Sequence, residues 1–548
     1  NVNSARGNAD YTIEAPLHYP FARSERPSLQ WINQTLVKAK PEFHKKTFLK
    51  PLHESSEFCG ACHKVHLPEE LNAYKWLRGQ NHYDSFLLSG VSGHGVQSFY
   101  YPQQAETNCN GCHMEALPSD DFGARQIGEE PGLQVHDHQF PSANTAIPHM
   151  LDMPGWVNER HTEMLKDSLR VDIFGIRESG RIDGTLHAPL PSGELVLQPG
   201  QQYLVEVVIR TLELGHHFTQ GTSDSNEVWL HIEVGDGATT VATSGELQAP
   251  DMDVDAFAHF VNAYVIDREG RRIEKRDPEN IFTQLYDNQI PPGAADVVHY
   301  LLDVPEDHEG PVDISVSLKY RKFDTRFMRH FEGQEFDGND LPITVIASDH
   351  MQLPTGTAAV QREASNIPEW QRWNDYGIGL LRREQFRQAE EAFAVVESLG
   401  RGDGALNLAR VYLQEGRLAE AADALARAAN ATAPAPPWST SYFTAQLNLQ
   451  NGYVDEAIAA FRDVVETRFQ DARDRGFDFS LDYRLLNDLA LALSERAKFE
   501  RGQDSEQRAS TYRREAVEMY ERALVLDPEN AVAHYGLAQL HDPVSYTH

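Results

Sequence analysis

The chain has 548 residues, and 49 Lys or Arg against 82 Asp or Glu give it a formal net charge of −33. This length exceeds what one hydrophobic core usually supports, so two to four domains are expected. A surface this acidic repels nucleic acid and anionic lipid, and no apolar stretch is long enough to span a membrane, so the sequence predicts neither a nucleic-acid partner nor a membrane span. The negative charge is compatible with basic partners. Alternatively, the acidic residues only keep the chain soluble.

Residues 1–170 form an irregular, histidine-rich region. Proline interrupts segments such as 16–20 and 148–154, so these segments cannot form long helices. A region this irregular needs something other than its own side chains to pack around.

Two identical Cys-x-x-Cys-His motifs lie in this first region, and they contain all four cysteines of the chain. The spacing lets two thiols form thioethers with the two vinyl groups of one haem, while the adjacent imidazole reaches the iron. A zinc ribbon does not require a His directly after each second Cys, and a thioredoxin-like site would lie in a βαβ context that is absent here. The motifs therefore predict two covalent haem c groups, attached at Cys59, Cys62, Cys109 and Cys112, with His63 and His113 as iron ligands.

Each haem iron needs a sixth ligand or an open position, and this choice separates an electron carrier from an enzyme. Histidines crowd the region, whereas Met114 adjoins His113 too closely to reach the other face of the same haem. We therefore expect bis-histidine ligation, which gives lower reduction potentials than His/Met ligation.

The second region, residues 171–355, alternates apolar and polar residues with period two. Tyr203, Val205, Val207 and Ile209 fall on one face of a strand, and the same pattern recurs at 228–234, 298–304 and 314–320. Turn sequences such as 198–200 and 235–237 separate these runs. The pattern predicts an antiparallel β-sandwich.

The third region, residues 366–548, changes to helical periodicity and contains an internal repeat. Small residues twelve positions apart, followed four positions later by a large residue, recur along it, as in Gly377, Ala389 and Phe393. This is the tetratricopeptide (TPR) pattern, in which the small residues let two helices approach closely. The expected fold is therefore multidomain: an irregular haem-wrapped dihaem domain (1–170), an antiparallel β-sandwich (171–355) and an all-α TPR solenoid (366–548).

Five segments together resemble a known family. They are Glu57–Lys64, Trp76–Phe86, Asn108–Met114, His136–Phe140 and Gly215–Gly221. With the helical repeats, they resemble the multihaem cytochromes of the cytochrome c-554-like group fused to TPR repeats, which are exported bacterial proteins. The resemblance covers nearly the whole chain.

The resemblance implies distal haem ligands. A Trp followed by a short spacer and His implies His82, and a His-x-Phe motif after the last Cys-x-x-Cys-His implies His138. A Gly-His turn implies His216, although Thr219 and Gln220 replace the Pro-Thr of the family motif, and a tight turn with two exposed imidazoles is the alternative. There are three candidate distal histidines for only two haems. Either one of them is structural, or further haems lie upstream of Asn1. The resemblance favours further haems.

The location follows from the chemistry of haem attachment. Haem is joined to Cys-x-x-Cys-His outside the cytoplasm, so we expect an exported bacterial protein that is periplasmic, extracellular or on the cell surface. The chain begins at Asn1 with neither an initiator Met nor a signal peptide, which indicates a processed or incomplete start.

Three functional classes remain open. The leading hypothesis is an electron carrier with no catalytic residue, in which the sandwich shields or ligates the haems. Its partners would be redox proteins, chiefly other cytochromes, and the TPR module would dock them. The same sequence is equally compatible with self-assembly through the TPR and β domains into an extracellular haem polymer. The alternatives are a multihaem oxidoreductase that reduces a small nitrogen or sulfur compound, and a scaffold with structural haem. An enzyme needs an open iron in a polar pocket, and Lys64 with His66 makes no recognisable active site.

Overall fold

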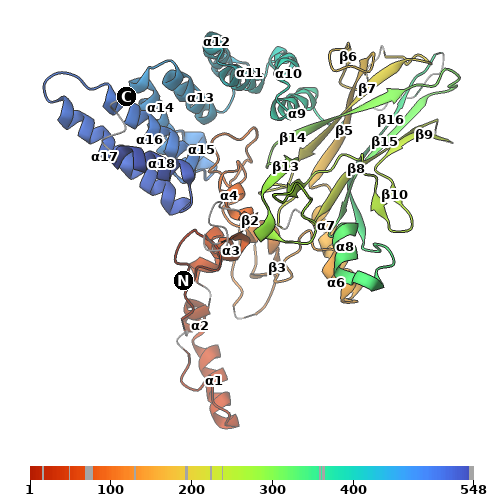
Figure 1. The fold of residues 1–548 in the computed structure, drawn as a ribbon. Coiled ribbons are helices and arrows are strands. Elements are labelled where there is room, and N and C mark those ends of the chain that lie inside the picture. Colours follow the sequence, from red (N-terminus) through yellow and green to blue (C-terminus); the bar gives the residue numbers. More distant parts are fainter. Residues whose placement is uncertain are drawn as a thin grey trace.

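The computed structural model describes residues 1–548 except 15–17, 49, 68–77, 122, 129–130, 192–194, 222–224, 237–238, 357–359, 361–364 and 542–548. Trp76 of the family motif thus lies outside the described residues. Figure 1 shows the N-terminal region at the junction between a β-rich region and a helical array, with α1 (Pro27–Ala39) and α2 (Pro41–Phe48) projecting away. None of the helices in the described part of the chain combines the length and apolarity needed to cross a bilayer.

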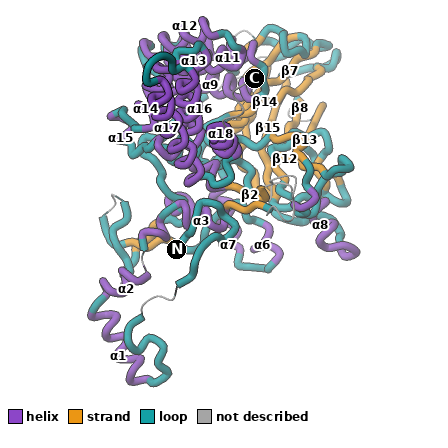
Figure 2. Tube along the Cα trace, turned by 60° about the vertical axis from the view of Figure 1, so that its left-hand side comes forward, coloured by secondary structure: helices purple, strands orange, loops and turns teal. Residues whose placement is uncertain are grey.

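The remaining N-terminal elements are short. Between Pro51 and Leu165 the chain forms η1 (Pro51–Glu54), α3 (Ser56–His63), β1 (Lys64–His66), β2 (Arg78–Asn81), α4 (His82–Leu87), α5 (Asn110–His113), β3 (Ala116–Pro118), β4 (Gln134–His136), α6 (Ala146–Met150) and α7 (Gly155–Leu165). The pairs β1–β2 and β3–β4 are antiparallel. Loops connect these pieces (Figure 2), as expected for a segment interrupted by proline.

Two four-stranded antiparallel sheets form the β region, which confirms that the period-two runs are strands. The first has the order β14 (Ala295–Asp303), β7 (Gln202–Thr211), β5 (Leu169–Glu178), β6 (Leu186–His187), and the second β16 (Ile343–Leu353), β15 (Val312–Arg321), β8 (Glu227–Gly235), β9 (Thr240–Ser244). Val207 and Ile173 of the first sheet share one apolar core with Leu230 and Val316 of the second. The smaller elements are β10 (Leu247–Gln248), β11 (Asp253–Val254), β12 (Ala263–Ile266), η2 (Pro278–Asn280), β13 (Thr283–Asp287), α8 (Thr325–Glu332) and η3 (Gly333–Glu335).

The C-terminal region is helical, as its periodicity predicts. It contains α9 (Glu369–Arg382), α10 (Phe386–Ser398), α11 (Gly402–Glu415), α12 (Leu418–Asn430), α13 (Pro437–Gln450), α14 (Val454–Val465), α15 (Gln470–Asp474), η4 (Phe479–Leu481), α16 (Tyr483–Lys498), α17 (Ser505–Leu526) and α18 (Ala531–His541). The longer helices pack each against the next along the chain, with α14 packing directly against α16. A Cβ at Gly377 would lie 2.6 Å from the Phe393 ring, and one at Gly536 would lie 2.3 Å from the Tyr520 ring, so only glycine permits these approaches.

The burial of β7 departs from simple alternation, because side chains on both of its faces are buried. Helix α9 packs on β7 and β14 and covers a face that the first sheet would otherwise leave in solvent. Polar groups on that face are paired: Asp375 of α9 accepts hydrogen bonds from Arg210 at 2.8 Å and from Arg170, and Arg372 donates to Asp172 at 2.7 Å. These buried ion pairs attach the helical array to the β region.

We predict that Asp375→Ala destabilises the protein by about 3–5 kcal/mol, because it leaves the buried Arg210 guanidinium without its carboxylate. The measurement is the midpoint of chemical denaturation, with Glu391→Ala as the control in an exposed pair with Arg387, worth about 0–1 kcal/mol. Equal shifts for the two variants would contradict this account of the interface.

Candidate functional site

Three short helices carry the motif residues. Helix α3 ends at His63 and contains Cys59 and Cys62, and α5 ends at His113 and follows Cys109 directly. Helix α4 begins at His82, because the side chain of Asn81 caps it by accepting a hydrogen bond from the backbone of Asp84. A Cβ at Gly60 would lie 2.6 Å from the Tyr83 ring, so glycine in the first motif lets α3 and α4 touch.

The two cysteine motifs meet. The thiols of Cys59 and Cys109 are neighbours, and their interaction lowers the pKa of Cys59 and raises that of Cys109. All four cysteines are free thiols. Residues fifty positions apart in sequence are therefore neighbours, and the two motifs form one continuous site.

Four imidazoles converge beside these thiols. The ring centres of His63 and His82 are 5.3 Å apart, and those of His82 and His216 are 4.8 Å apart. His113 and His216 have parallel rings, with an interplanar angle of 3° and centres 6.3 Å apart. The turn that contains His216 reaches this cluster because Gly215 packs on Phe86 of α4, where a Cβ would lie 3.1 Å from the ring.

Burial keeps the inner imidazoles neutral. It lowers the pKa of His82 well below its ordinary value, and the neighbouring His216 and His63 lower it further. Burial also lowers the pKa of His216 to about 4. A neutral imidazole has a lone pair available for a metal, which a protonated one lacks.

Hydrogen bonds orient two of these rings. Nδ1 of His113 donates to the carbonyl of Pro141 at 2.9 Å, and Nδ1 of His216 donates to the carbonyl of His217 at 3.1 Å. A histidine that binds a metal through Nε2 usually donates its other ring N–H in this way. Nδ1 of His82 is buried, and none of the residues that the structure describes hydrogen-bonds it.

His138 occupies a different setting. Its side chain is exposed, its Nδ1 donates to the carbonyl of His136 at 2.8 Å, and its ring contacts Phe140. The cluster of four imidazoles does not include it, so its role as a distal ligand stays a prediction.

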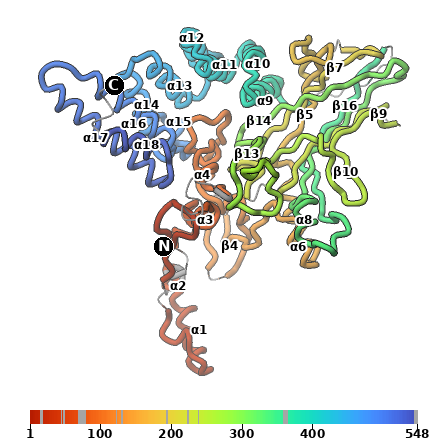
Figure 3. Tube along the Cα trace, in the orientation of Figure 1, coloured from red at the N-terminus to blue at the C-terminus, as the bar shows by residue number. Residues whose placement is uncertain are grey.

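Lys64, directly after His63, is fully buried. Its ammonium lies 3.0 Å from Asp84 of α4 and 3.0 Å from Asp527 at the end of α17. Nearby, His66 lies 3.5 Å from Glu529. Figure 3 shows α17 and α18 on the side of the helical array that faces α3. Lys64 therefore holds the first motif, the His82 helix and the C-terminal helices together, and it is unlike a residue of an open catalytic pocket.

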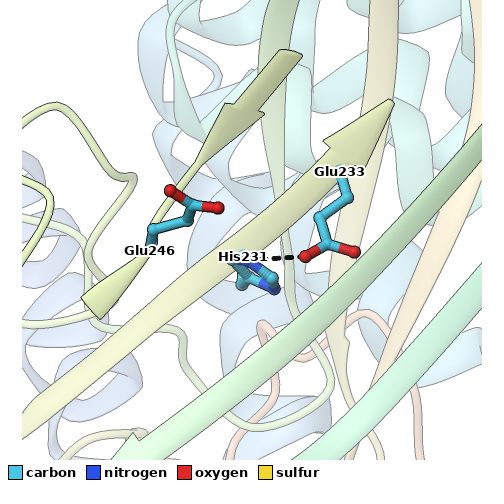
Figure 4. A group of neighbouring side chains, drawn as sticks. All are labelled: His231, Glu233 and Glu246. Carbon is cyan, nitrogen blue, oxygen red and sulfur yellow. Dashed lines mark ion pairs between the residues drawn. The ribbon is translucent and has the colours of Figure 1, made fainter. Parts of the chain in front are cut away.

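The donor set at the motifs fits haem c better than zinc. Zinc needs four ligand atoms around one point. Within the described residues, one group of three His, Cys, Asp or Glu side chains has its ligand atoms all within 4.8 Å of one another. It consists of His231, Glu233 and Glu246 (Figure 4). These residues lie on β8 and in the loop after β9, away from the two motifs. The motif residues offer thiols for thioethers and imidazoles in facing pairs, which are the groups that haem c requires.

Sequence reasoning missed the His231 group, which has no motif spacing. His231 and Glu233 share a face of β8, with Nε2 3.5 Å from Oε1. Burial and Lys319 lower the pKa of His231, while both glutamates raise it. Both carboxylates are exposed and one cation already lies nearby, so these contacts are those of a surface ion-pair group.

Comparisons with known proteins give little. No family model matches the chain, and no curated protein matches it. Similar solved structures include a penta-haem cytochrome c552 from Thermochromatium tepidum (14% identity, TM-score 0.34, covering 63% of this chain and 70% of that one) and a monomeric IFIT1 mutant (18% identity, TM-score 0.24, covering 31% and 38%). At these TM-scores the likenesses carry no argument about fold or function.

We predict that Lys64→Met destabilises the protein by about 3–5 kcal/mol, because Asp84 and Asp527 would lose the buried ammonium that lies between them. Denaturation midpoints measure this, with Lys498→Met, in a surface pair with Glu495, as the control. The loop at Asp527 should also become more sensitive to limited proteolysis. Unchanged stability and proteolysis would show that Lys64 does not hold these segments together.

Proposed function

We propose that this protein is an exported c-type cytochrome that carries two covalent haems and transfers electrons. The observation that supports this most strongly is the convergence of both motif histidines with His82 and His216 in one cluster. Haem iron would supply the one-electron redox couple at this site.

The geometry favours a particular pairing of ligands. Two imidazoles that bind one metal from opposite sides have ring centres about 6 Å apart, because each nitrogen lies about 2 Å from the metal. His113 and His216 have this separation, parallel rings, and Nδ1 atoms already bonded to backbone carbonyls. We therefore assign His113 and His216 to the haem at Cys109 and Cys112, and His63 and His82 to the haem at Cys59 and Cys62.

The contact between the motifs supports electron exchange within the site. Cys59 and Cys109 touch, and His82 and His216 are neighbouring rings although they belong to different pairs. Closely spaced redox centres pass electrons readily, so the pair would act as one short conductor. His138, with no place in this cluster, would serve a haem outside the two motifs or a structural purpose.

The other regions would position and connect this site. Residues 171–355, as a β-sandwich, would supply His216, and residues 366–548, as a TPR solenoid, would dock a partner. The close Gly377–Phe393 and Gly536–Tyr520 contacts support the TPR assignment. Partners would be other cytochromes or further copies of this chain, in the periplasm or outside the cell.

An enzyme that reduces a small nitrogen or sulfur compound is the less favoured function. It requires an iron with an open position, whereas each motif histidine faces a second imidazole. Lys64 and His66 are engaged with carboxylates. These contacts support a carrier.

Haem stoichiometry tests the proposal directly. The chain produced in a host that matures c-type cytochromes should give two haems per protein in a pyridine haemochrome assay, and Cys109→Ala/Cys112→Ala should give one. A protein that folds without covalent haem would refute the proposal.

The ligand assignment has its own test. His216→Ala should convert one of two low-spin haems to a high-spin form that binds carbon monoxide. Wild type should bind none, and neither should His187→Ala, a control whose half-buried imidazole pairs with the exposed Glu178. Low-spin spectra in His216→Ala would refute the pairing. The same change at His138 should leave both haems low-spin, and a high-spin haem in that variant would restore His138 as a ligand of this pair.

A further inference from the structure

A cavity of about 1000 Å³ lies where the three regions meet. Helices α9, α11, α13 and α16 contribute one wall, α4 contributes another, and the turn after His216 closes a third side. It adjoins the imidazole cluster, because His217 and Gly221 line it and a Cβ at Gly221 would lie 4.0 Å from His82. Its volume is at the upper end for small-molecule sites.

The charged groups of the cavity wall are mostly positive, in a protein with a net charge of −33. Arg382, Arg410 and Arg484 line it, and Asp84 is the one carboxylate among its lining residues. Asp84 is already paired with Lys64 at 3.0 Å. The cavity therefore has an excess of positive charge where the surface as a whole is acidic.

Backbone carbonyls, which carry no formal charge, hold these three arginines. Arg410 donates to the carbonyls of Gln97 and Ser98, Arg382 to those of Ala295 and Gln289, and Arg484 to that of Leu88. Among the described residues, Arg410 and Arg382 have no carboxylate within ion-pair distance. The carbonyls fix the guanidinium groups in place without neutralising the charges of Arg410 and Arg382.

Two of the guanidinium groups are tightly enclosed by the protein. Among the described residues, none hydrogen-bonds Nε of Arg410 or Nε of Arg484, and both atoms are buried. Nε of Arg484 lies 3.6 Å from Asp482, whose side chain accepts hydrogen bonds from the backbone of Val96, Arg484 and Leu485. Burial, together with the neighbouring Arg484, lowers the pKa of Arg410 to about 10, so the two cations lie close enough to repel each other.

Neutral polar groups complete the wall. Gln80, Gln97, Gln220, Gln414, Gln446 and Gln450 are among its lining residues. Tyr442 and Gln446 of this wall donate to Asp488, and burial raises the pKa of that carboxyl to about 6. A ligand that accepts several hydrogen bonds would find both charged and neutral donors here.

We infer that this cavity binds a small multivalent anion, a polycarboxylate or an oxyanion, between the helical array and the imidazole cluster. Guanidinium groups that line a cavity and are held mainly by neutral backbone carbonyls keep a positive charge there, which attracts the oxygens of carboxylates and oxyanions. The propionates of a haem bound at His82 are the other source of the same chemistry. The site goes beyond electron transfer and does not depend on it.

The test is isothermal titration calorimetry of the haem-loaded, full-length protein with citrate and with sulfate at low ionic strength. Citrate should bind in the micromolar to low millimolar range, and uncharged glycerol should not bind. Arg484→Gln should weaken citrate binding roughly tenfold, because one charged hydrogen-bond donor is lost. Arg417→Gln, a surface arginine on the same helical array, should bind citrate like wild type.

A second variant protects the test against misfolding of Arg484→Gln. Gln414 is an exposed residue of the cavity wall, so Gln414→Glu should fold and should also weaken citrate binding roughly tenfold by placing a carboxylate there. The control is Gln470→Glu, on α15 outside the cavity.

Three outcomes would overturn the inference. One is a wild-type protein that binds neither citrate nor sulfate at millimolar concentration, and another is equal loss of binding in the wall variants and their controls. The third is a wild type that binds no added anion while Arg484→Gln shifts a haem midpoint potential, which would assign the guanidinium groups to the propionates.

Discussion

The Lys64 ammonium is fully buried between two carboxylates that come from opposite ends of the chain, Asp84 and Asp527. A buried charge is stable only when its partners stay in place, so this contact constrains all three segments at once. Lys64 follows His63 directly, and Asp84 lies two residues after His82. The ion pair that links these segments thereby also sets the distance between the His63 and His82 imidazoles.

The same principle operates where the helical array meets the β region. Asp375 and Arg372 of α9 pair with Arg210 and Asp172 of the first sheet in a buried interface. With α9 fixed there and α17 fixed at Lys64, the array is attached at both ends and curves over the N-terminal region. The cavity lined by Arg382, Arg410 and Arg484 is the space that this double attachment encloses.

The elements of the fold were largely predictable. Strands occur where apolar and polar residues alternate, because alternate side chains lie on the same face of a strand and one face is buried. Helices occur where small and large residues recur at helical spacing. The burial of β7 on both faces was not predictable, since it depends on α9, which lies over 150 residues away. The site divides in the same way: the motif histidines follow from local spacing, whereas the grouping of His82 with His216 needs the Gly215–Phe86 contact between two distant segments.

The sequence by itself determined the chemistry of Cys-x-x-Cys-His, because thiol and imidazole positions within five residues depend only on local backbone geometry. It also determined where strands and helices form, because the spacing of apolar residues along the chain differs between the two. Only the tertiary structure decided that the two motifs touch and which imidazoles lie beside them. It also decided that Lys64 forms a buried ion pair between distant segments, and that three arginines from separate helices line one cavity. These relations depend on contacts between residues far apart in sequence, and such contacts exist only after the regions have packed together.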